Sequence, residues 1–265
     1  MKIGIIGMGW VGASVAIGGF GTVGLAAAGA EPAERVRAAA GGPSLRRDWP
    51  CPGCWFQPAP GEGPAPLLVV LHGDAAAGHA PDLRTPFVAL QDAARARGFA
   101  VLAPRCPAEH GCTRGSYWQW TQGSPSAWLA EQVRAVTAAY RIDAERISLL
   151  GWSGGASYAG SVVPELGERF AAVAFVGGGM PPEPLPPECP RCLPPAYFLT
   201  GDKNPFHYLA QALRGLYTRC AAEARWQLLP GAGHEGELSA LHSPARVAAL
   251  LDWLSQQKKR RCPAP

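Results

Sequence analysis

The segment Gly151-Trp152-Ser153-Gly154-Gly155 contains the residue types that point most directly to chemistry. It has the pattern Gly-x-Ser-x-Gly and lies between an apolar run, Arg146–Leu150, and a helix-like segment that starts at Gly154. A sharp strand-to-helix turn of this kind lifts a serine hydroxyl out at the edge of a sheet, where glycines relieve backbone crowding. The pattern therefore predicts Ser153 as a nucleophile; the alternative is a plain glycine-rich turn.

A serine hydroxyl becomes a good nucleophile only when a base removes its proton. Of the 6 histidines, His234 lies in a glycine-rich segment directly after the last strand-like run. We expect it on a loop at the same edge of the sheet as Ser153 and predict it as the base. His207 is expected to line the site, and His242 is expected at the surface or at a helix cap.

The base needs an acid that orients it. The strand-like run before His234 ends at Leu199-Thr200-Gly201-Asp202-Lys203-Asn204-Pro205, and Asp202 is the carboxylate of that loop. We predict Asp202 as the orienting acid, with Glu183 as a second candidate. The structural alternative for Asp202 is a turn residue that bonds its own backbone.

The oxyanion of an acyl-transfer reaction needs two N–H donors. The backbone N–H of Gly154, immediately after the nucleophile, is the first candidate. The second is the N–H of Asp74, in the segment Leu71-His72-Gly73-Asp74 at the end of the first strand-like run. We expect His72 to fix this loop rather than to act in catalysis.

Aromatic side chains cluster around these segments and are candidates for a substrate-binding wall. Core or interface packing is the alternative for each of them. The candidates are Tyr117, Trp118, Trp120 and Trp152.

Strand-like and helix-like segments alternate from Pro64 to the C-terminus. Continuous apolar runs such as Leu67–Leu71 are typical of strands buried on both faces. Strand–helix alternation favours a parallel sheet with helices on both faces, an α/β fold. The expected strands are 67–71, 99–103, 146–150, 171–176, 195–200 and 226–229, and the expected helices are 82–97, 126–140, 154–166, 208–220 and 243–256.

These motifs resemble those of the α/β-hydrolase fold and, within it, of the polyhydroxybutyrate depolymerase, feruloyl esterase and carboxylesterase group. The resemblance covers about residues 64–254. It includes the lead-in Tyr140-Arg141-Ile142-Asp143-Ala144-Glu145-Arg146-Ile147, which is similar to the Y-x-I-D-x-x-R-I of those enzymes. It implies a serine esterase that cleaves small-molecule or polymeric carboxylic esters through an acyl-enzyme, with no cofactor and no metal.

One position departs from the pattern of that group. There the acid often sits three residues after the loop glycine, which in this chain is Asn204. Either Asp202 is brought in by a shifted loop, or Asn204 orients His234 as a neutral partner. The second case motivates an alternative function, a non-catalytic binding protein with the same fold.

The N-terminal segment has the features of an export signal or a membrane anchor. Residues 3–30 contain no charged side chain, Lys2 precedes them, and small residues end the run, as before a signal-peptide cleavage site. We therefore divide the chain into a leader at 1–30, a linker at 31–50 and a catalytic domain at 51–265. Membrane contact is expected only through residues 3–30.

The same N-terminal segment contains a literal Gly-x-Gly-x-x-Gly from Gly7 to Gly12. That motif binds dinucleotides only inside a strand–helix–strand unit. No β-branched run follows before Pro50 to supply the second strand. A dinucleotide-dependent oxidoreductase is therefore the weakest alternative.

The 8 cysteines are an even number, and with the leader they favour disulfides in a secreted or periplasmic protein. We expect pairs Cys106–Cys112 and Cys220–Cys262. The remaining cysteines form two C-x-x-C pairs, Cys51/Cys54 and Cys189/Cys192, for which closure on themselves, cross-linking and a zinc site stay open.

The charge distribution argues against nucleic-acid binding. The net charge is only +4, and the one basic run, 258–261, stands near the C-terminus, where a solvated tail is expected. With 48% hydrophobic residues the chain can bury a sizeable core, which excludes a wholly disordered protein.

Overall fold

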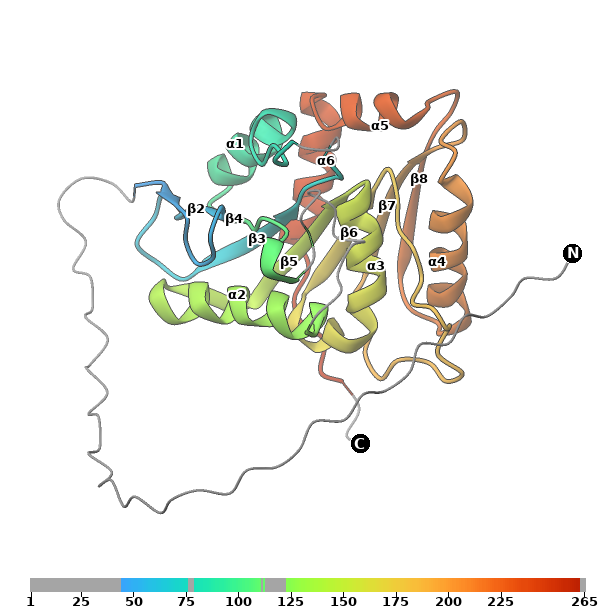
Figure 1. Cartoon of the computed structure of the whole chain (residues 1–265), viewed down its shortest axis with the longest axis horizontal. Helices are drawn as coiled ribbons and strands as arrows, with labels where there is room; N and C mark the ends of the chain where they lie inside the picture. The colour runs from blue at the N-terminus through green and yellow to red at the C-terminus, as the bar shows by residue number, and fades with distance from the viewer. Residues whose placement is uncertain (1–43, 76–78, 111, 113–122, 263–265) are drawn as a thin grey trace, which may run out of the picture. The chain divides into compact units, whose positions relative to one another are not determined.

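The computed structural model describes residues 44–75, 79–110, 112 and 123–262. Its centre is an eight-stranded sheet in the order β1-β2-β4-β3-β5-β6-β7-β8. All pairings from β4 to β8 are parallel, whereas β1 and β2 pair antiparallel at one edge (Figure 1). The strands are β1 (Arg46–Arg47), β2 (Trp55–Gln57), β3 (Ala65–Leu71), β4 (Ala100–Ala103), β5 (Ile142–Trp152), β6 (Ala172–Val176), β7 (Ala196–Gly201) and β8 (Ala224–Leu229).

Helices cover both faces of this sheet, and the α/β class with a mostly parallel sheet, predicted from the sequence, is confirmed. One face packs against α2, α3 and α4, and the other packs against α1, α5 and α6 (Figure 1). The helices are α1 (Val88–Ala96), α2 (Pro125–Ala139), α3 (Gly154–Leu166), α4 (His207–Arg219), α5 (His234–Ala240) and α6 (Pro244–Ser255).

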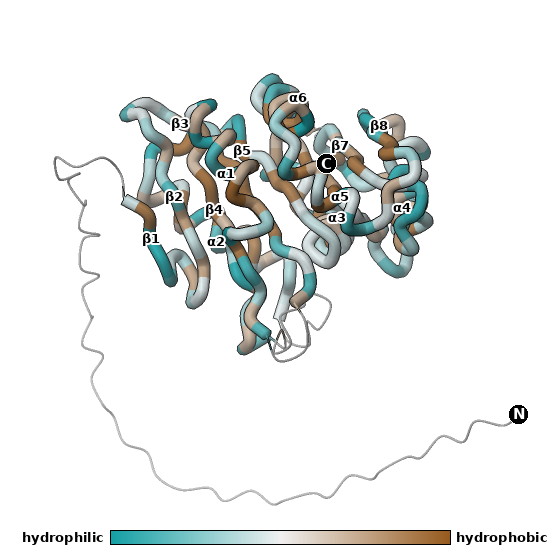
Figure 2. The backbone as a smooth tube through the Cα atoms, turned by 90° about the horizontal axis from the view of Figure 1, so that it is seen from above, coloured by the Kyte–Doolittle hydropathy of each residue, from teal (hydrophilic) through white to brown (hydrophobic). Residues whose placement is uncertain are grey.

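The central strands are apolar throughout because each has two buried faces. In β3, Leu67, Val69 and Leu71 point to the face covered by α2 and α3. Leu68 and Val70 point to the face covered by α1 and α6. Hydrophobic residues accordingly follow the central strands, whereas hydrophobic and hydrophilic residues mix along the helices (Figure 2). This continuous pattern is what a parallel sheet requires.

The expected helices and strands occur close to their predicted places, but β5 begins at Ile142, before the expected start at Arg146, and one helix begins later than expected. The segment predicted as a helix from Asp82 begins with a 3₁₀ turn, Thr85–Phe87, and becomes α-helical only at Val88. Asp82 accepts hydrogen bonds from the N–H groups of Arg84 and Thr85 and so caps the turn. The proline at the start of that turn fits this position, since it has no N–H to satisfy.

Two short strands, β1 and β2, and one short α-helix, α5, were not predicted. They are too short for a hydrophobic period to show, because β1 and β2 have 2 and 3 residues and α5 has 7. Since β1 joins the sheet and Trp49 packs against the core, residues 44–50 of the predicted linker belong to the folded domain. The predicted leader and the Gly7–Gly12 motif lie outside the described residues.

Four disulfides join all eight cysteines. Cys106–Cys112 is as predicted, and Cys51–Cys54 closes one C-x-x-C pair on itself. The expected pair Cys220–Cys262 is wrong, because Cys220 bonds Cys189 and Cys262 bonds Cys192. The second C-x-x-C therefore serves as a double anchor, which ties the segment after β6 to the end of α4 and to the C-terminal tail.

These bonds use every cysteine that a zinc site would have needed. Within the described ranges no group of three or more His, Cys, Asp or Glu could hold a metal ion. In the same part of the chain no helix is long and apolar enough to cross a membrane.

Candidate active site

Ser153 stands on a strained turn between β5 and α3. Its φ and ψ angles are +52° and −117°, a backbone conformation that non-glycine residues rarely adopt. The turn is crowded: a Cβ atom on Gly155 would lie 2.7 Å from the carbonyl oxygen of Leu71. Glycine at positions 151 and 155 is therefore needed for the strand to turn here and to expose the serine hydroxyl.

The structure brings Ser153 and His234 together. The Nε2 atom of His234 lies 2.9 Å from the Oγ atom of Ser153. His234 does not lie on a loop, as expected, but is the first residue of α5, directly after the β8 turn. The loops after β7 and β8 are joined by a hydrogen bond from the N–H of Lys203 to the carbonyl of Ala232, 3.0 Å long.

Two aromatic rings hold the imidazole of His234. Trp152 stacks on it with 4.5 Å between ring centroids and 15° between planes, and Phe206 meets it edge-on at 6.1 Å. Trp152 is buried, whereas Phe206 is exposed. The ring of Trp152, a predicted substrate-lining residue, thus packs against the imidazole of His234.

Two side chains reach the other ring nitrogen of His234. Its Nδ1 atom lies 3.1 Å from Oε2 of Glu237 and 3.2 Å from Nδ2 of Asn204. Glu237 was not among the sequence candidates. The sequence feature that could have identified Glu237 is its spacing of three residues from His234, because residues three apart on a helix share a face. The helix α5 itself, however, was not predicted.

The carboxylate of Glu237 is fully buried and accepts several hydrogen bonds. Its Oε1 accepts from the N–H of Gly201 at 2.6 Å and from the hydroxyl of Thr200 at 3.3 Å. Its Oε2 accepts from Nδ2 of Asn204 at 2.6 Å. Because each of these partners donates, the site is built for an ionised carboxylate.

The orientation of the Asn204 amide follows from its other contacts. Its Oδ1 accepts from the N–H of Phe206 at 2.8 Å, and its Nδ2 also reaches the carbonyl of Gly177 at 3.3 Å. Both amide hydrogens are thus directed to oxygen atoms. Asn204 contacts the imidazole of His234, but the acceptor available to an Nδ1–H group is Glu237.

The structure places neither predicted acid beside His234. Asp202 is exposed, and its Oδ1 accepts a hydrogen bond from the N–H of Gly231, 2.7 Å long, which ties the loop after β7 to the turn after β8. This contact also differs from the structural alternative for Asp202, because its partner lies in another loop and not in the turn that contains Asp202. Glu183 is exposed in the segment after β6.

His207, expected to line the site, faces the interior instead. Its Nδ1 lies 3.2 Å from Oγ1 of Thr200, and its ring meets Trp226 edge-on. Since Thr200 in turn contacts Glu237, His207 is linked to the carboxylate through one hydroxyl group.

The loop after β3 lies against the nucleophile turn. A Cβ atom on Gly73 would lie 2.7 Å from Cδ1 of Trp152 and 3.2 Å from Cβ of Ser153. Asp74 follows it, and its carboxyl group would overlap a Cβ atom on Gly154. The two predicted oxyanion donors, the N–H groups of Asp74 and Gly154, therefore stand on segments that meet beside Ser153.

The buried side chain of His72 fixes this loop by two hydrogen bonds. Its Nδ1 lies 2.7 Å from the carbonyl of Gly73, and its Nε2 accepts from the N–H of Cys106 at 3.1 Å. Burial lowers the pKa of His72 to about 4, against the opposing effect of the Gly73 hydrogen bond and with a further lowering by Arg105. The imidazole is therefore neutral near pH 7.

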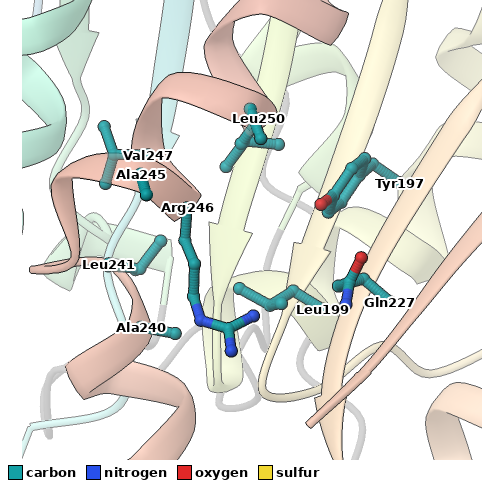
Figure 3. A pocket seen from close by; sticks show the side chains of 10 residues that line it. Tyr197, Leu199, Gln227, Ala240, Leu241, Ala245, Arg246, Val247 and Leu250 are labelled. Atoms are coloured by element: carbon teal, nitrogen blue, oxygen red, sulfur yellow. The ribbon is translucent and has the colours of Figure 1, made fainter.

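The described cavities lie away from this centre. One, of about 160 Å³, opens between α6 and the strands β7 and β8, where Arg246 and Tyr197 face it (Figure 3). A second lies under α5 and includes Gly236 and Ser239. The candidate aromatics Tyr117, Trp118 and Trp120 lie outside the described residues.

Comparison with known proteins agrees with the resemblance seen in the sequence. Residues 55–183 match the family of esterase PHB depolymerases. No curated protein sequence is significantly similar to the chain.

Many solved structures have a similar fold. A thermostable esterase is 18% identical, with a TM-score of 0.58, and the match covers 82% of this chain and 62% of that one. Est1E from Butyrivibrio proteoclasticus is 16% identical, with a TM-score of 0.54 and coverage of 82% and 100%. Esterase PE8 is 19% identical, with a TM-score of 0.52 and coverage of 76% and 96%.

Proposed function

We propose that this chain, a carboxylic ester hydrolase of the α/β-hydrolase fold that resembles the PHB depolymerase esterases, cleaves esters through an acyl-enzyme on Ser153. The observation that carries the proposal is the contact between Ser153 Oγ and His234 Nε2, 2.9 Å long, on the strained turn after β5. A hydroxyl aligned with an imidazole is the arrangement that general-base activation requires.

The reaction starts when Ser153 attacks the ester carbonyl and its proton passes to Nε2 of His234. For this transfer Nε2 must be free to accept, so the ring hydrogen is on Nδ1, where Oε2 of Glu237 accepts it. The carboxylate then stabilises the imidazolium that forms. Glu237 therefore replaces Asp202 in the role that the sequence analysis predicted.

The tetrahedral intermediate carries its negative charge on the former carbonyl oxygen. The backbone N–H groups of Gly154 and Asp74 are proposed to hold it, which is supported by the close approach of their two segments. A donor of this kind contributes roughly 3–4 kcal/mol to the stability of the transition state. The alcohol leaves with the proton from His234, and water then releases the acid by the same steps in reverse order.

The non-catalytic alternative rested on the amide at position 204. A buried carboxylate at hydrogen-bonding distance from His234 Nδ1 removes that reason, because the histidine has a charged partner after all. The oxidoreductase alternative rested on residues 7–12, outside the described residues.

A fluorophosphonate probe tests the proposal. It should label the unreduced protein at Ser153, and Ser153→Ala should abolish both labelling and ester hydrolysis. A well-folded protein that is not labelled would overturn the assignment. A panel of p-nitrophenyl, feruloyl and polyester substrates then defines the acyl and alcohol groups that the site accepts.

We also propose that the protein works outside the cytosol. Four disulfides in one domain are typical of the oxidising periplasm or extracellular space. The charge-free segment 3–30 would supply the export signal or an anchor. Fractionation of cells that express the full chain tests this. The protein should be recovered outside the cytosolic fraction with its thiols oxidised.

A further inference from the structure

Two different side chains stand at almost the same distance from Nδ1 of His234. Oε2 of Glu237 lies at 3.1 Å and Nδ2 of Asn204 at 3.2 Å, and these two atoms are themselves 2.6 Å apart. One position carries a negative charge and the other a neutral amide. Either position is therefore close enough to present an acceptor atom to the imidazole.

Each polar atom of the Asn204 amide has a hydrogen-bond partner. Its oxygen accepts from the N–H of Phe206, and its NH₂ group reaches Gly177 and Glu237. Asn204 is almost fully buried, at 4% exposure, so that loss of one partner would leave an unsatisfied polar group.

The carboxylate of Glu237 is held by hydrogen-bond donors of this kind. Besides His234, the described contacts to its carboxylate come from the backbone N–H of Gly201, the hydroxyl of Thr200 and the amide of Asn204. No lysine or arginine among the described residues contacts it. The nearby ionisable side chains are His207, which reaches it through Thr200, and the exposed groups Asp202, Lys203 and Glu235.

The backbone at both positions is fixed independently of the charge. Asn204 lies in the loop after β7, whose Lys203 N–H binds Ala232. Glu237 lies on α5, and its own N–H binds the carbonyl of Gly233. Exchanging the carboxylate and the amide between the two positions therefore requires no movement of the main chain.

We propose that Asn204 and Glu237 form an exchangeable amide–carboxylate pair. Asn204 is the positioning residue that holds the carboxylate of Glu237 against His234, and a negative charge at either of the two positions can orient the imidazole. This inference rests on the proposed serine esterase function.

The experiment compares the wild type with Glu237→Gln, Asn204→Asp and the double variant that carries both changes. Hydrolysis of p-nitrophenyl butyrate is measured as kcat and KM across pH, with circular dichroism as the folding check. Glu235→Gln, an exposed carboxylate on the same helix, is the matched control and should keep kcat within about threefold of the wild type.

Glu237→Gln should lower kcat by roughly 10³–10⁴-fold, as expected when the partner of a catalytic histidine loses its charge. The double variant should recover at least about tenfold of this loss. In that variant the carboxylate introduced at position 204 accepts from Nδ1 of His234, and the amide introduced at position 237 donates to this carboxylate. Recovery stays incomplete, since the new carboxylate oxygen would face the carbonyl of Gly177.

Asn204→Asp alone places two carboxylates side by side, where they must share a proton. Its kcat should therefore fall relative to the wild type as the pH rises, whereas kcat of the double variant should not. A purely structural role for Asn204 would give no rescue and no change in the pH profile.

The inference is overturned if the folded double variant is no more active than Glu237→Gln. It is also overturned if Asp202→Asn, rather than Glu237→Gln, abolishes activity. Both outcomes leave the esterase proposal intact, because that proposal fails only if the wild type neither reacts with the fluorophosphonate probe nor hydrolyses any ester in the panel.

Discussion

The indole ring of Trp152 lies flat against the imidazole ring of His234, with 4.5 Å between their centroids. Trp152 directly precedes Ser153 in the chain, so one short segment supplies both the proposed nucleophile and an aromatic ring that orients its proposed base. Stacked aromatic rings of this kind contribute roughly 0.5–1.5 kcal/mol beyond the area they bury.

Loss of the stacked indole ring of Trp152 should lower kcat more than it changes substrate binding. In Trp152→Leu the imidazole gains freedom to rotate away from Ser153, and we expect kcat to fall by about 10–100-fold. Trp152→Phe retains a flat ring and should stay within about tenfold of the wild type. Steady-state kinetics checks this, and a Leu variant as active as the Phe variant would contradict the role of the stacked ring.

The neutral state of His72 makes the folded protein sensitive to acid. Its pKa is lowered from 6.5 to about 4 by burial, so that between these values the unfolded chain binds a proton that the folded chain does not. Stability from this residue is therefore complete above about pH 6.5 and is lost as the pH falls towards 4. The loss amounts to about 3 kcal/mol.

Urea unfolding at several pH values measures this effect. Between pH 6.5 and about pH 4 the free energy of unfolding should fall less steeply in His72→Gln than in the wild type. The comparison uses slopes, because the substitution also removes the contacts to Gly73 and Cys106 and lowers stability at every pH. Equal slopes would show that protonation of His72 does not limit acid stability.

Much of the fold was readable because its signals are long and repeated. The buried strands are continuous apolar runs, and the Gly-x-Ser-x-Gly turn requires a strand before it and a helix after it, as the structure has. At the start of α2, Ser124 caps the helix by accepting a hydrogen bond from the N–H of Ala127.

The contact between Glu237 and His234 was not predicted, and the reason is physical. Asp202 was chosen by its place after a strand, but that place gives it the N–H of Gly231 as a nearer partner. Glu237 reaches His234 only because α5 forms, and a seven-residue helix is too short to show a periodic pattern. The disulfide partners of Cys189 and Cys192 were also not predicted, because they depend on which distant segments the fold brings together.

The disulfide between Cys192 and Cys262 should matter most for stability. It closes a sequence separation of 70 residues, whereas Cys106–Cys112 closes only 6. On the chain-entropy estimate the longer link stabilises the fold by about 4 kcal/mol and the shorter one by about 2 kcal/mol. Urea unfolding of the two paired Cys→Ser variants measures the difference, and an equal loss in both would contradict it.

The Cys106–Cys112 disulfide should affect activity more than the Cys192–Cys262 disulfide does. The N–H of Cys106 donates to His72, and His72 holds the loop that carries Asp74 beside the nucleophile turn. Removing Cys106–Cys112 as a serine pair frees this anchor, so we expect kcat to fall by about tenfold or more while most of the stability remains. Removing Cys192–Cys262 as a serine pair, far along the chain from this loop, should do the reverse. Measuring kcat and the free energy of unfolding on both variants decides the matter, because the prediction fails if the same variant is the worse one in both measurements.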